Sequence, residues 1–315
     1  MRTQVYLFFM IALIAQACGN KSANQTNGNN VLDFDQAFLS AQELYELGNL
    51  DSSEAMLNLA YALDSTSYDL NLFRADVLFA QKNFVGSLSS YKKCLAINNN
   101  DPKVWARLGK IYLNQNDHKS ALKYFNEAIS RDQSFADAYI GRAIIFGKKD
   151  KMDQAYLSLQ TAIDFDPNNV NALLTMAQWK LADSAQIAIQ YLTNAIRIDS
   201  TNADFYYQRA KAFERFETYK SAELDYQKAL KLDSANVNYA FNMAYFYYQF
   251  EVWNQALHYF NYCLELKNDD KDVLLGKALC LKELNNLEQA KETLQQLLQI
   301  DPNDADAIRE LENLR

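Results

Sequence analysis

The sequence predicts an all-α fold, and three observations predict it. The 315 residues include only 8 glycines and 3 prolines, whereas all-β and disordered chains use more of both. Each proline directly follows an aspartate. Because proline disrupts a helix interior and restricts the residue before it, the stretches between the prolines are predicted to be helical. The third observation is a repeat of 34 residues, a period typical of stacked helical hairpins.

The first 17 residues are predicted to be a secretory signal peptide. Arg2 supplies the basic start, and Val5 to Ala15 form an apolar run that is too short to span a bilayer. The segment LIAQACGN is similar to a bacterial lipoprotein signal, in which the cysteine, here Cys18, is lipidated and becomes the new N-terminus. Gln16 departs from that pattern, so ordinary cleavage before Cys18 is one alternative. An uncleaved anchor on a cytoplasmic protein is another.

Residues 18–33 are predicted to be the lipidated cysteine and a flexible tether. Gly19 to Asn30 contain no large apolar side chain, so burial cannot offset the entropy lost on ordering this segment.

Residues 34–304 divide into eight repeats, each of 34 residues except the fifth, which has 33. The repeats start at Phe34, Tyr68, Pro102, Ala136, Val170, Ala203, Val237 and Lys271. One column of the first predicted helix never holds a residue larger than alanine, from Ala41 to Ala278. Small residues in register let two helix backbones approach closely, and large neighbours fill the gaps between them.

The repeat that starts at Pro102 has the spacing of the tetratricopeptide repeat family, which the chain resembles. It carries Trp105, Leu108, Gly109, Tyr112, Ala121, Phe125 and Ala128 at the positions of the family pattern. Arg74, Arg142, Arg209 and Lys277 stand where that pattern has leucine. The resemblance implies a right-handed α-solenoid of about eight helix-turn-helix units with one concave and one convex face. Residues 305–315 are predicted to form a short capping helix, because Ile308, Leu311 and Leu314 share one side.

Composition and motifs disfavour several function classes. The net charge of −8 and the pI near 5.0 disfavour nucleic acid as a partner, because phosphate binding needs clustered Lys and Arg. The chain has no nucleophile elbow, phosphate loop or CxxC pair, and its two histidines, His118 and His258, lack partners for metal or acid-base work. We therefore expect no enzyme, no cofactor and no metal. Cys94 and Cys263 occupy a column of small residues, and a disulfide between Cys263 and Cys280 is an alternative to free thiols.

The first helices of such repeats line the concave groove in the family that the chain resembles. Residues on these helices that avoid the packing columns form the predicted partner-binding set, which is Tyr207, Lys211, Arg215, Phe241, Asn242, Tyr245, Tyr248, Gln249, Lys103, Arg107 and Lys110. Aromatic rings provide contact area at low entropic cost, and polar neighbours fix the register of a bound peptide. The alternative is that each ring only packs. A carboxylate clamp of the kind known in this family is not expected, because its positions are mostly apolar or acidic here, and they include Leu72, Asp76, Ile140 and Ile144.

The predicted function is a non-enzymatic scaffold. It would be an envelope-anchored lipoprotein that holds a protein or peptide partner in its concave groove, in envelope assembly, secretion or surface machinery. Gly19 after the cysteine favours sorting to the outer membrane, facing the periplasm, and only the lipid would contact the membrane. The alternative is a periplasmic receptor for a small ligand or glycan that uses the aromatic groove, since tyrosines stack on sugar rings.

Overall fold

The computed structural model describes residues 32–267 and 269–314. The predicted signal peptide, Cys18 and nearly all of the predicted tether lie outside the described residues. The described part contains 17 α-helices and no strand, which confirms the all-α prediction. The chain divides into two compact bodies, of which the first ends at Ile97 and the second begins at Asn98.

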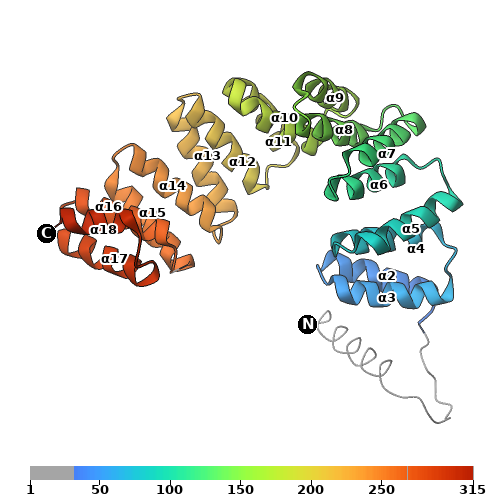
Figure 1. Ribbon diagram of the computed structural model, residues 1–315, viewed down its shortest axis with the longest axis horizontal. Helices are drawn as coiled ribbons and strands as arrows, with labels where there is room; N and C mark the ends of the chain where they lie inside the picture. The colour runs from blue at the N-terminus through green and yellow to red at the C-terminus, as the bar shows by residue number, and fades with distance from the viewer. Residues whose placement is uncertain (1–31, 268, 315) are drawn as a thin grey trace, which may run out of the picture. The chain divides into compact units, whose positions relative to one another are not determined.

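The helices form hairpins that follow one another within each body (Figure 1). The first body holds α2 (Phe34–Glu46), α3 (Leu50–Leu63), α4 (Tyr68–Ala80) and α5 (Phe84–Ile97). The second body holds α6 (Pro102–Asn114), α7 (His118–Arg131), α8 (Ala136–Lys148), α9 (Met152–Phe165), α10 (Val170–Asp183), α11 (Ala185–Ile198), α12 (Ala203–Arg215), α13 (Tyr219–Leu232), α14 (Val237–Gln249), α15 (Trp253–Leu266), α16 (Lys271–Glu283), α17 (Leu287–Ile300) and α18 (Ala305–Asn313). We call the even-numbered helices α2 to α16 the first helices and the odd-numbered helices α3 to α17 the second helices.

The eight first helices begin at the eight residues where the 34-residue frame starts, from Phe34 to Lys271. Side chains that cap the first backbone N–H groups explain why the helices begin at these residues. Asp101, the residue before Pro102, accepts a hydrogen bond from the backbone N–H of Lys103 at 2.8 Å, and Pro102 is the first residue of α6, where its missing N–H costs nothing. Asn169, Asn202, Asn236 and Asp270 cap later first helices in the same way.

The other two prolines lie just after second helices. Asp166 and Asp301 are the C-caps of α9 and α17, and each side chain accepts a hydrogen bond from the backbone N–H two residues later, at 3.2 and 3.3 Å. This Asx turn ends the helix, and Pro167 and Pro302 cannot continue it. The Asp-Pro pairs therefore mark both kinds of helix boundary in the stack.

A left-handed residue closes the turn inside seven of the eight hairpins. Gly48, Lys82, Asn116, Asp150, Glu217, Glu251 and Asn285 have φ between 56° and 75°, and each is the middle residue of a three-residue turn. The fifth repeat differs, because Ser184 alone connects α10 to α11. The fifth repeat is therefore one residue shorter because its turn is shorter, and this turn contains no left-handed residue.

The core lies between the first and second helices and repeats with the frame. The small-residue columns are buried, as at Ala75, Ala143 and Ala244, each with no exposed surface. Large side chains from the second helices fill the spaces between successive first helices, for example Phe125 and Phe260. This interdigitation of large and small residues is what close-packed helix interfaces require.

The arginine that replaces the family's leucine pairs with a neighbouring second helix, that of its own hairpin for Arg209 and that of the preceding hairpin for Arg74. Arg209 donates to the Asp225 carboxylate through Nε at 2.6 Å and Nη2 at 2.9 Å, and Asp225 is only 6% exposed. Arg74 donates to the Asn58 side chain at 2.9 Å and lies over the Tyr61 ring. These positions stabilise the packing of adjacent helices by charged and polar contacts where leucine would use apolar ones.

The last helix closes the second body. Ala307 of α18 is fully buried, and Leu311 and Leu314 pack against the core formed with Leu294 and Leu297. Ile308, which the sequence pattern placed on the same side, is 39% exposed. Among residues 32–267 and 269–314, no helix has both the length and the apolar character needed to cross a membrane.

Candidate partner-binding groove

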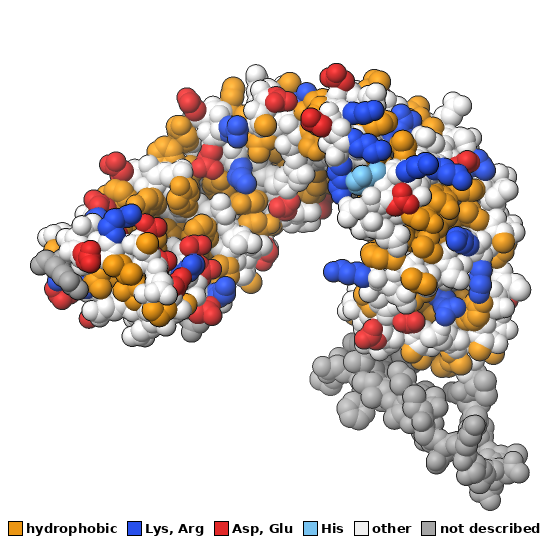
Figure 2. Space-filling view, viewed as in Figure 1, with side chains coloured by type: hydrophobic (Ala, Val, Ile, Leu, Met, Phe, Trp, Pro, Cys, Tyr) orange, Lys and Arg blue, Asp and Glu red, His pale blue; other side chains and the backbone are white. Residues whose placement is uncertain are grey.

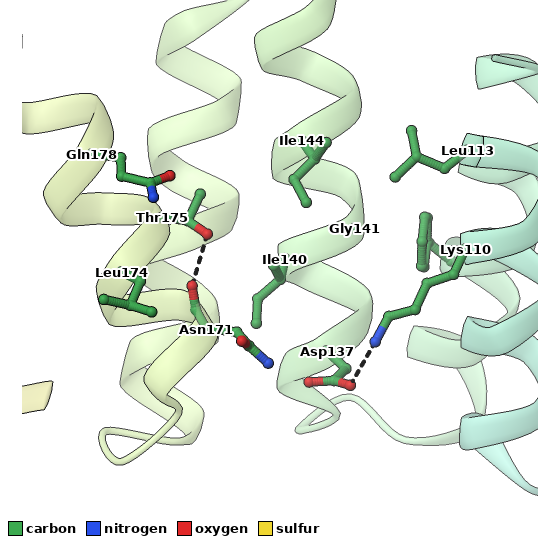
Figure 3. A pocket seen from close by; sticks show the side chains of 11 residues that line it. Lys110, Leu113, Asp137, Ile140, Gly141, Ile144, Asn171, Leu174, Thr175 and Gln178 are labelled. Atoms are coloured by element: carbon green, nitrogen blue, oxygen red, sulfur yellow. Dashed lines mark hydrogen bonds and ion pairs between the residues drawn. The ribbon is translucent and has the colours of Figure 1, made fainter. Parts of the chain in front are cut away.

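The first helices of the third, fourth and fifth repeats form a hollow of about 340 Å³ (Figure 3). The helices α6, α8 and α10 supply all but one of its lining residues. Its apolar part consists of Leu113, Phe125, Ile140, Gly141, Ile144 and Leu174, and its polar part consists of Lys110, Asp137, Asn171, Thr175 and Gln178. We call this hollow the groove. An apolar surface with a few polar groups at fixed positions is the usual composition of a ligand site.

The floor of the groove depends on one pairing between a large and a small residue. Phe125 reaches from the second helix α7 to the first helices on either side of it. A Cβ atom on Gly141 would lie 2.2 Å from Cζ of Phe125, and one on Gly109 would lie 2.9 Å from Cδ1. Only glycine leaves room for this ring. The same pairing recurs at Gly276, where a Cβ would lie 2.4 Å from Cζ of Phe260.

Polar side chains rim the groove and link neighbouring first helices. Lys110 Nζ on α6 lies 3.2 Å from Asp137 Oδ2 on α8, with both side chains about one third exposed. Gln178 Nε2 on α10 donates to Gln208 Oε1 on α12 at 3.4 Å. Thr175 Oγ1 donates to the Asn171 carbonyl of its own helix at 2.7 Å. The amides of Asn171 and Gln178 supply both donors and acceptors, which suits the backbone of an extended peptide.

Further along the same side of the second body, aromatic rings form a row on α14. Phe241, Tyr245 and Tyr248 stack in sequence, with centroids 6.5 and 6.4 Å apart and rings within 17° of parallel. Tyr248 also contacts Trp253 edge to face at 5.3 Å. Tyr245 is 48% exposed, so the row presents its middle ring to solvent. Residues spaced by four and three positions share one side of a helix, which is why these rings meet.

The preceding first helix adds Tyr207 and Lys211 to this region. Tyr207 contacts Tyr239 at 5.0 Å, and Lys211 Nζ lies 5.5 Å from the centre of the Tyr207 ring. Burial raises the pKa of Tyr207 and of Tyr248 above its usual value, because a low-dielectric environment disfavours the charged phenolate. Burial also raises the pKa of Glu214, although its hydrogen bond with Tyr226 and the charge of Lys211 oppose the rise.

The structure brings part of the predicted set together and separates the rest. Phe241, Tyr245 and Tyr248 form the row, and Tyr207 with Lys211 packs beside them. Asn242 donates to the Asn238 carbonyl of its own helix at 2.7 Å, and Arg215 and Gln249 lie exposed at the ends of α12 and α14. Of the three residues predicted on α6, Lys110 lines the groove, whereas Lys103 and Arg107 are not among its lining residues. Whether these residues bind a partner stays a prediction.

Sequence reasoning missed most of the groove, although the repeat frame contained the signal. Ile140 and Leu174 occupy the column of Tyr207 and Phe241. Ile144 and Gln178 occupy the column of Lys110, Lys211 and Tyr245. Extending the predicted columns through the fourth and fifth repeats would have found these four residues. The sequence prediction uses Ile140 and Ile144 only as evidence against a carboxylate clamp.

The first body has a hollow on the corresponding side of its own first helices. It measures about 300 Å³ and is lined by Phe38, Gln42, Asp69, Leu72, Phe73 and Asp76. The groove-side columns of the repeat therefore form hollows in both bodies.

Charge is uneven along this acidic chain. Residues 98–151 contain 10 Lys and Arg against 6 Asp and Glu, a net charge of +4, whereas residues 269–314 contain 5 Lys and Arg against 11 Asp and Glu, a net charge of −6. Figure 2 shows Lys and Arg side chains gathered over the region of α6 to α9 on the face in view. The groove begins in this basic region, because Lys110 lies at its α6 end.

Cysteines and metal ligands add no reactive centre to the described part of the chain. Cys94, Cys263 and Cys280 are buried. Cys263 and Cys280 are free thiols, so the structure does not contain the alternative disulfide between them. Burial raises the pKa of both of these thiols to about 12. Among residues 32–267 and 269–314, no three His, Cys, Asp or Glu side chains are grouped so that they could hold a metal ion.

The chain is similar to known proteins in sequence and in structure. A human protein named tetratricopeptide repeat protein 16 is 21% identical over 85% of this chain and 35% of its own length. The C-terminal part of a repeat-containing protein from Cytophaga hutchinsonii superposes with a TM-score of 0.62 at 21% identity, over 76% of this chain and 99% of that one. The crystal structure of the APC/C hetero-tetramer Cut9-Hcn1 has a TM-score of 0.55 at 19% identity, over 90% of this chain and 57% of that one.

The chain spans between 5% and 35% of the length of the curated relatives that it matches. Four family models, each described as a tetratricopeptide repeat, match residues 38–102, 102–135, 203–236 and 252–313. These segments carry most of the hairpins described above, and the same 34-residue spacing and small-residue columns continue through the hairpins between them. The repeated hairpins of this chain are therefore tetratricopeptide repeats, as the sequence predicted.

Proposed function

We propose that this protein is a non-enzymatic scaffold that holds a protein or peptide partner along the first helices of its second body. Tetratricopeptide repeats serve as protein interaction scaffolds. The observation that carries the proposal for this chain is the groove across α6, α8 and α10, in which an apolar floor lies beside amide and charged side chains. A peptide needs both, because apolar side chains provide affinity and polar groups fix its direction.

The aromatic row on α14 supports a second point of contact. Tyr245 is about half exposed and is held between Phe241 and Tyr248, so its ring is ordered before a partner arrives. Ordered aromatic rings are frequent binding hot spots, since little entropy is lost when they are covered. The Cut9-Hcn1 assembly, whose fold is similar, supports a role in protein assembly for this chain too.

The partner should carry acidic residues at the end that meets α6. Lys110 and the surrounding basic residues 98–151 contrast with the rest of the chain. Complementary charge accelerates association and orients a partner more than it raises affinity. An acidic segment beside α6, followed by apolar residues over Ile140 and Ile144, would match the groove.

We further propose that the scaffold is exported and anchored in the cell envelope by a lipid on Cys18, facing the periplasm from the outer membrane. The support is the sequence of residues 1–18, which lie outside the described residues. Replacing Cys18 with alanine should release the mature protein from membranes into the soluble fraction. Retention of the Cys18→Ala protein on membranes through high-salt washing would contradict the anchor.

Photocrosslinking in cells, followed by mass spectrometry, tests the scaffold itself. A benzoylphenylalanine placed at Gln178 in the full chain lies at the rim of the groove, and one placed at Leu157 lies on the second helix α9, where the side chain is 70% exposed. We expect a discrete crosslinked protein from position 178 and none from position 157. Equal crosslinking from both positions, or from neither, would contradict partner binding in the groove.

A further inference from the structure

A separate hollow of about 390 Å³ lies on the opposite set of helices, between α13 and α15. These are the second helices of the sixth and seventh repeats, so the hollow is not part of the groove. Its lining residues come from α13 and the turn after it and from α15, and they are Gln227, Leu230, Lys231, Ser234, His258, Tyr259 and Tyr262. We call it the tyrosine pocket.

Two tyrosines in this pocket are fixed by contacts behind them. Tyr259 stacks on Tyr247 with centroids 5.7 Å apart and planes 9° from parallel, and Tyr247 in turn donates to Glu223 Oε1 at 2.6 Å. Tyr262 donates its hydroxyl to the Ser234 carbonyl at 2.8 Å. Rings held in this way form a platform that loses little freedom when a ligand covers it.

The pocket has a positive rim. Its lining includes Lys231 and His258 and no carboxylate, although the chain as a whole carries a net charge of −8. Within the described part, Lys231 makes no ion pair shorter than 4 Å, and His258 is exposed and meets Tyr259 edge to face at 5.0 Å. A neutral ligand would leave this lysine unused, whereas an anionic ligand would pair with it.

We propose that the tyrosine pocket binds an anionic sugar ring, such as a uronic acid unit of an acidic glycan. The C–H faces of a sugar stack on tyrosine rings, Gln227 and Ser234 offer donors and acceptors for its hydroxyls, and Lys231 with His258 receives its carboxylate. The volume of about 390 Å³ accommodates a ring and its substituents. Because this pocket is on the other set of helices, a glycan and a groove-bound partner could be held at the same time.

Calorimetric titration of the full chain with tetragalacturonate tests this proposal. The matched neutral probe is the same tetrasaccharide with its carboxylates methyl-esterified, and the matched peptide probe is tetraglutamate. We expect binding of tetragalacturonate, and binding of the ester and of tetraglutamate that is weaker by at least about tenfold. No binding of tetragalacturonate, equal binding of the ester, or equal binding of tetraglutamate would each overturn the proposal.

Variants locate the binding. Lys231→Gln removes the rim charge and Tyr262→Ala removes one ring, and each should weaken the tetragalacturonate complex about tenfold while the helical circular dichroism signal stays unchanged. Lys220→Gln is the control, because Lys220 is an exposed lysine of the same helix that does not line the pocket. If Lys220→Gln weakened tetragalacturonate binding as much as Lys231→Gln, the sugar would bind general surface charge. If Lys231→Gln left the affinity unchanged, the sugar would bind outside the tyrosine pocket. Either result would overturn the assignment.

Discussion

Replacing Gly141 with alanine probes the contact that forms the floor of the groove. The added Cβ would lie 2.2, 2.3 and 2.5 Å from three atoms of the Phe125 ring, whereas carbon atoms in favourable contact are about 3.5 to 4.0 Å apart. Phe125 is fully buried, so its ring cannot move aside freely. Overpacking of this kind costs about 1 to 3 kcal/mol, and the better helix propensity of alanine returns about 1 kcal/mol. We expect a net loss of about 1 to 2 kcal/mol in the free energy of unfolding.

Two further variants make the result specific. Gly147 lies on the same helix, and a Cβ there would be 3.3 Å from the nearest atom of Trp179. Because a shift of a few tenths of an ångström relieves that contact, Gly147→Ala should cost less than Gly141→Ala. Phe125→Leu should rescue Gly141→Ala. The chain already pairs leucine with a larger residue at the same spacing of 16 positions, in Leu159 with Thr175.

Urea denaturation followed by circular dichroism measures these differences. In a double-mutant cycle, we expect a favourable coupling energy of at least about 1 kcal/mol between Phe125→Leu and Gly141→Ala. Additive effects of the two substitutions, or a Gly141→Ala protein that is more stable than the wild type, would refute the packing described for the groove floor.

Three other outcomes follow from contacts of the described residues. Asp225→Asn should destabilise the protein by about 2 to 3 kcal/mol in urea denaturation, because Arg209 then loses its buried carboxylate. Lys291→Gln affects a pair with the highly exposed Glu288 and should change the free energy of unfolding by less than about 0.5 kcal/mol. Similar effects of the two substitutions would contradict the difference in burial between the two pairs. Gly48→Ala should cost about 1 kcal/mol because Gly48 has φ of 75° with open space around it, and an unchanged unfolding midpoint would contradict that strain. Since burial raises the pKa of Cys263 and Cys280 to about 12, only about one thiol in ten thousand is ionised at pH 8. Peptide mapping after iodoacetamide treatment should find both cysteines unmodified in the native protein and modified in urea, and rapid native labelling at pH 8 would be inconsistent with their burial.

The repeat frame was accessible from the sequence because it depends on local, repeated constraints. Small residues such as Ala75 and Ala143 must recur wherever two helices meet closely, and cap residues such as Asp101 and Asn236 must recur wherever a helix starts. Each constraint acts within one hairpin or between adjacent hairpins. Self-similarity at a single period therefore determined where all eight first helices begin.

The position of the groove was harder to predict because it depends on which residues meet across repeats. Gly141 leaves space for the ring of Phe125, which is 16 residues earlier and on a different helix. No pattern within a single repeat indicates that this small residue and this large residue meet. The predicted aromatic residues Phe241 and Tyr245 do meet, because their spacing on one helix is local. Tyr259 and Tyr262 lie on a second helix and were not predicted, because the predicted binding set contains only residues of first helices.

Equilibrium binding of the captured partner to groove variants is the decisive test of partner binding in the groove. Once crosslinking at position 178 has identified the partner, its affinity for the full chain can be measured by calorimetry with Ile144→Glu, which places a charge in the apolar part of the groove. The matched control is Leu157→Glu on α9, an exposed position outside the groove. We expect at least about a tenfold loss of affinity for Ile144→Glu and unchanged affinity for Leu157→Glu. Unchanged affinity for Ile144→Glu, in a protein that keeps its helical signal, would contradict partner binding in the groove.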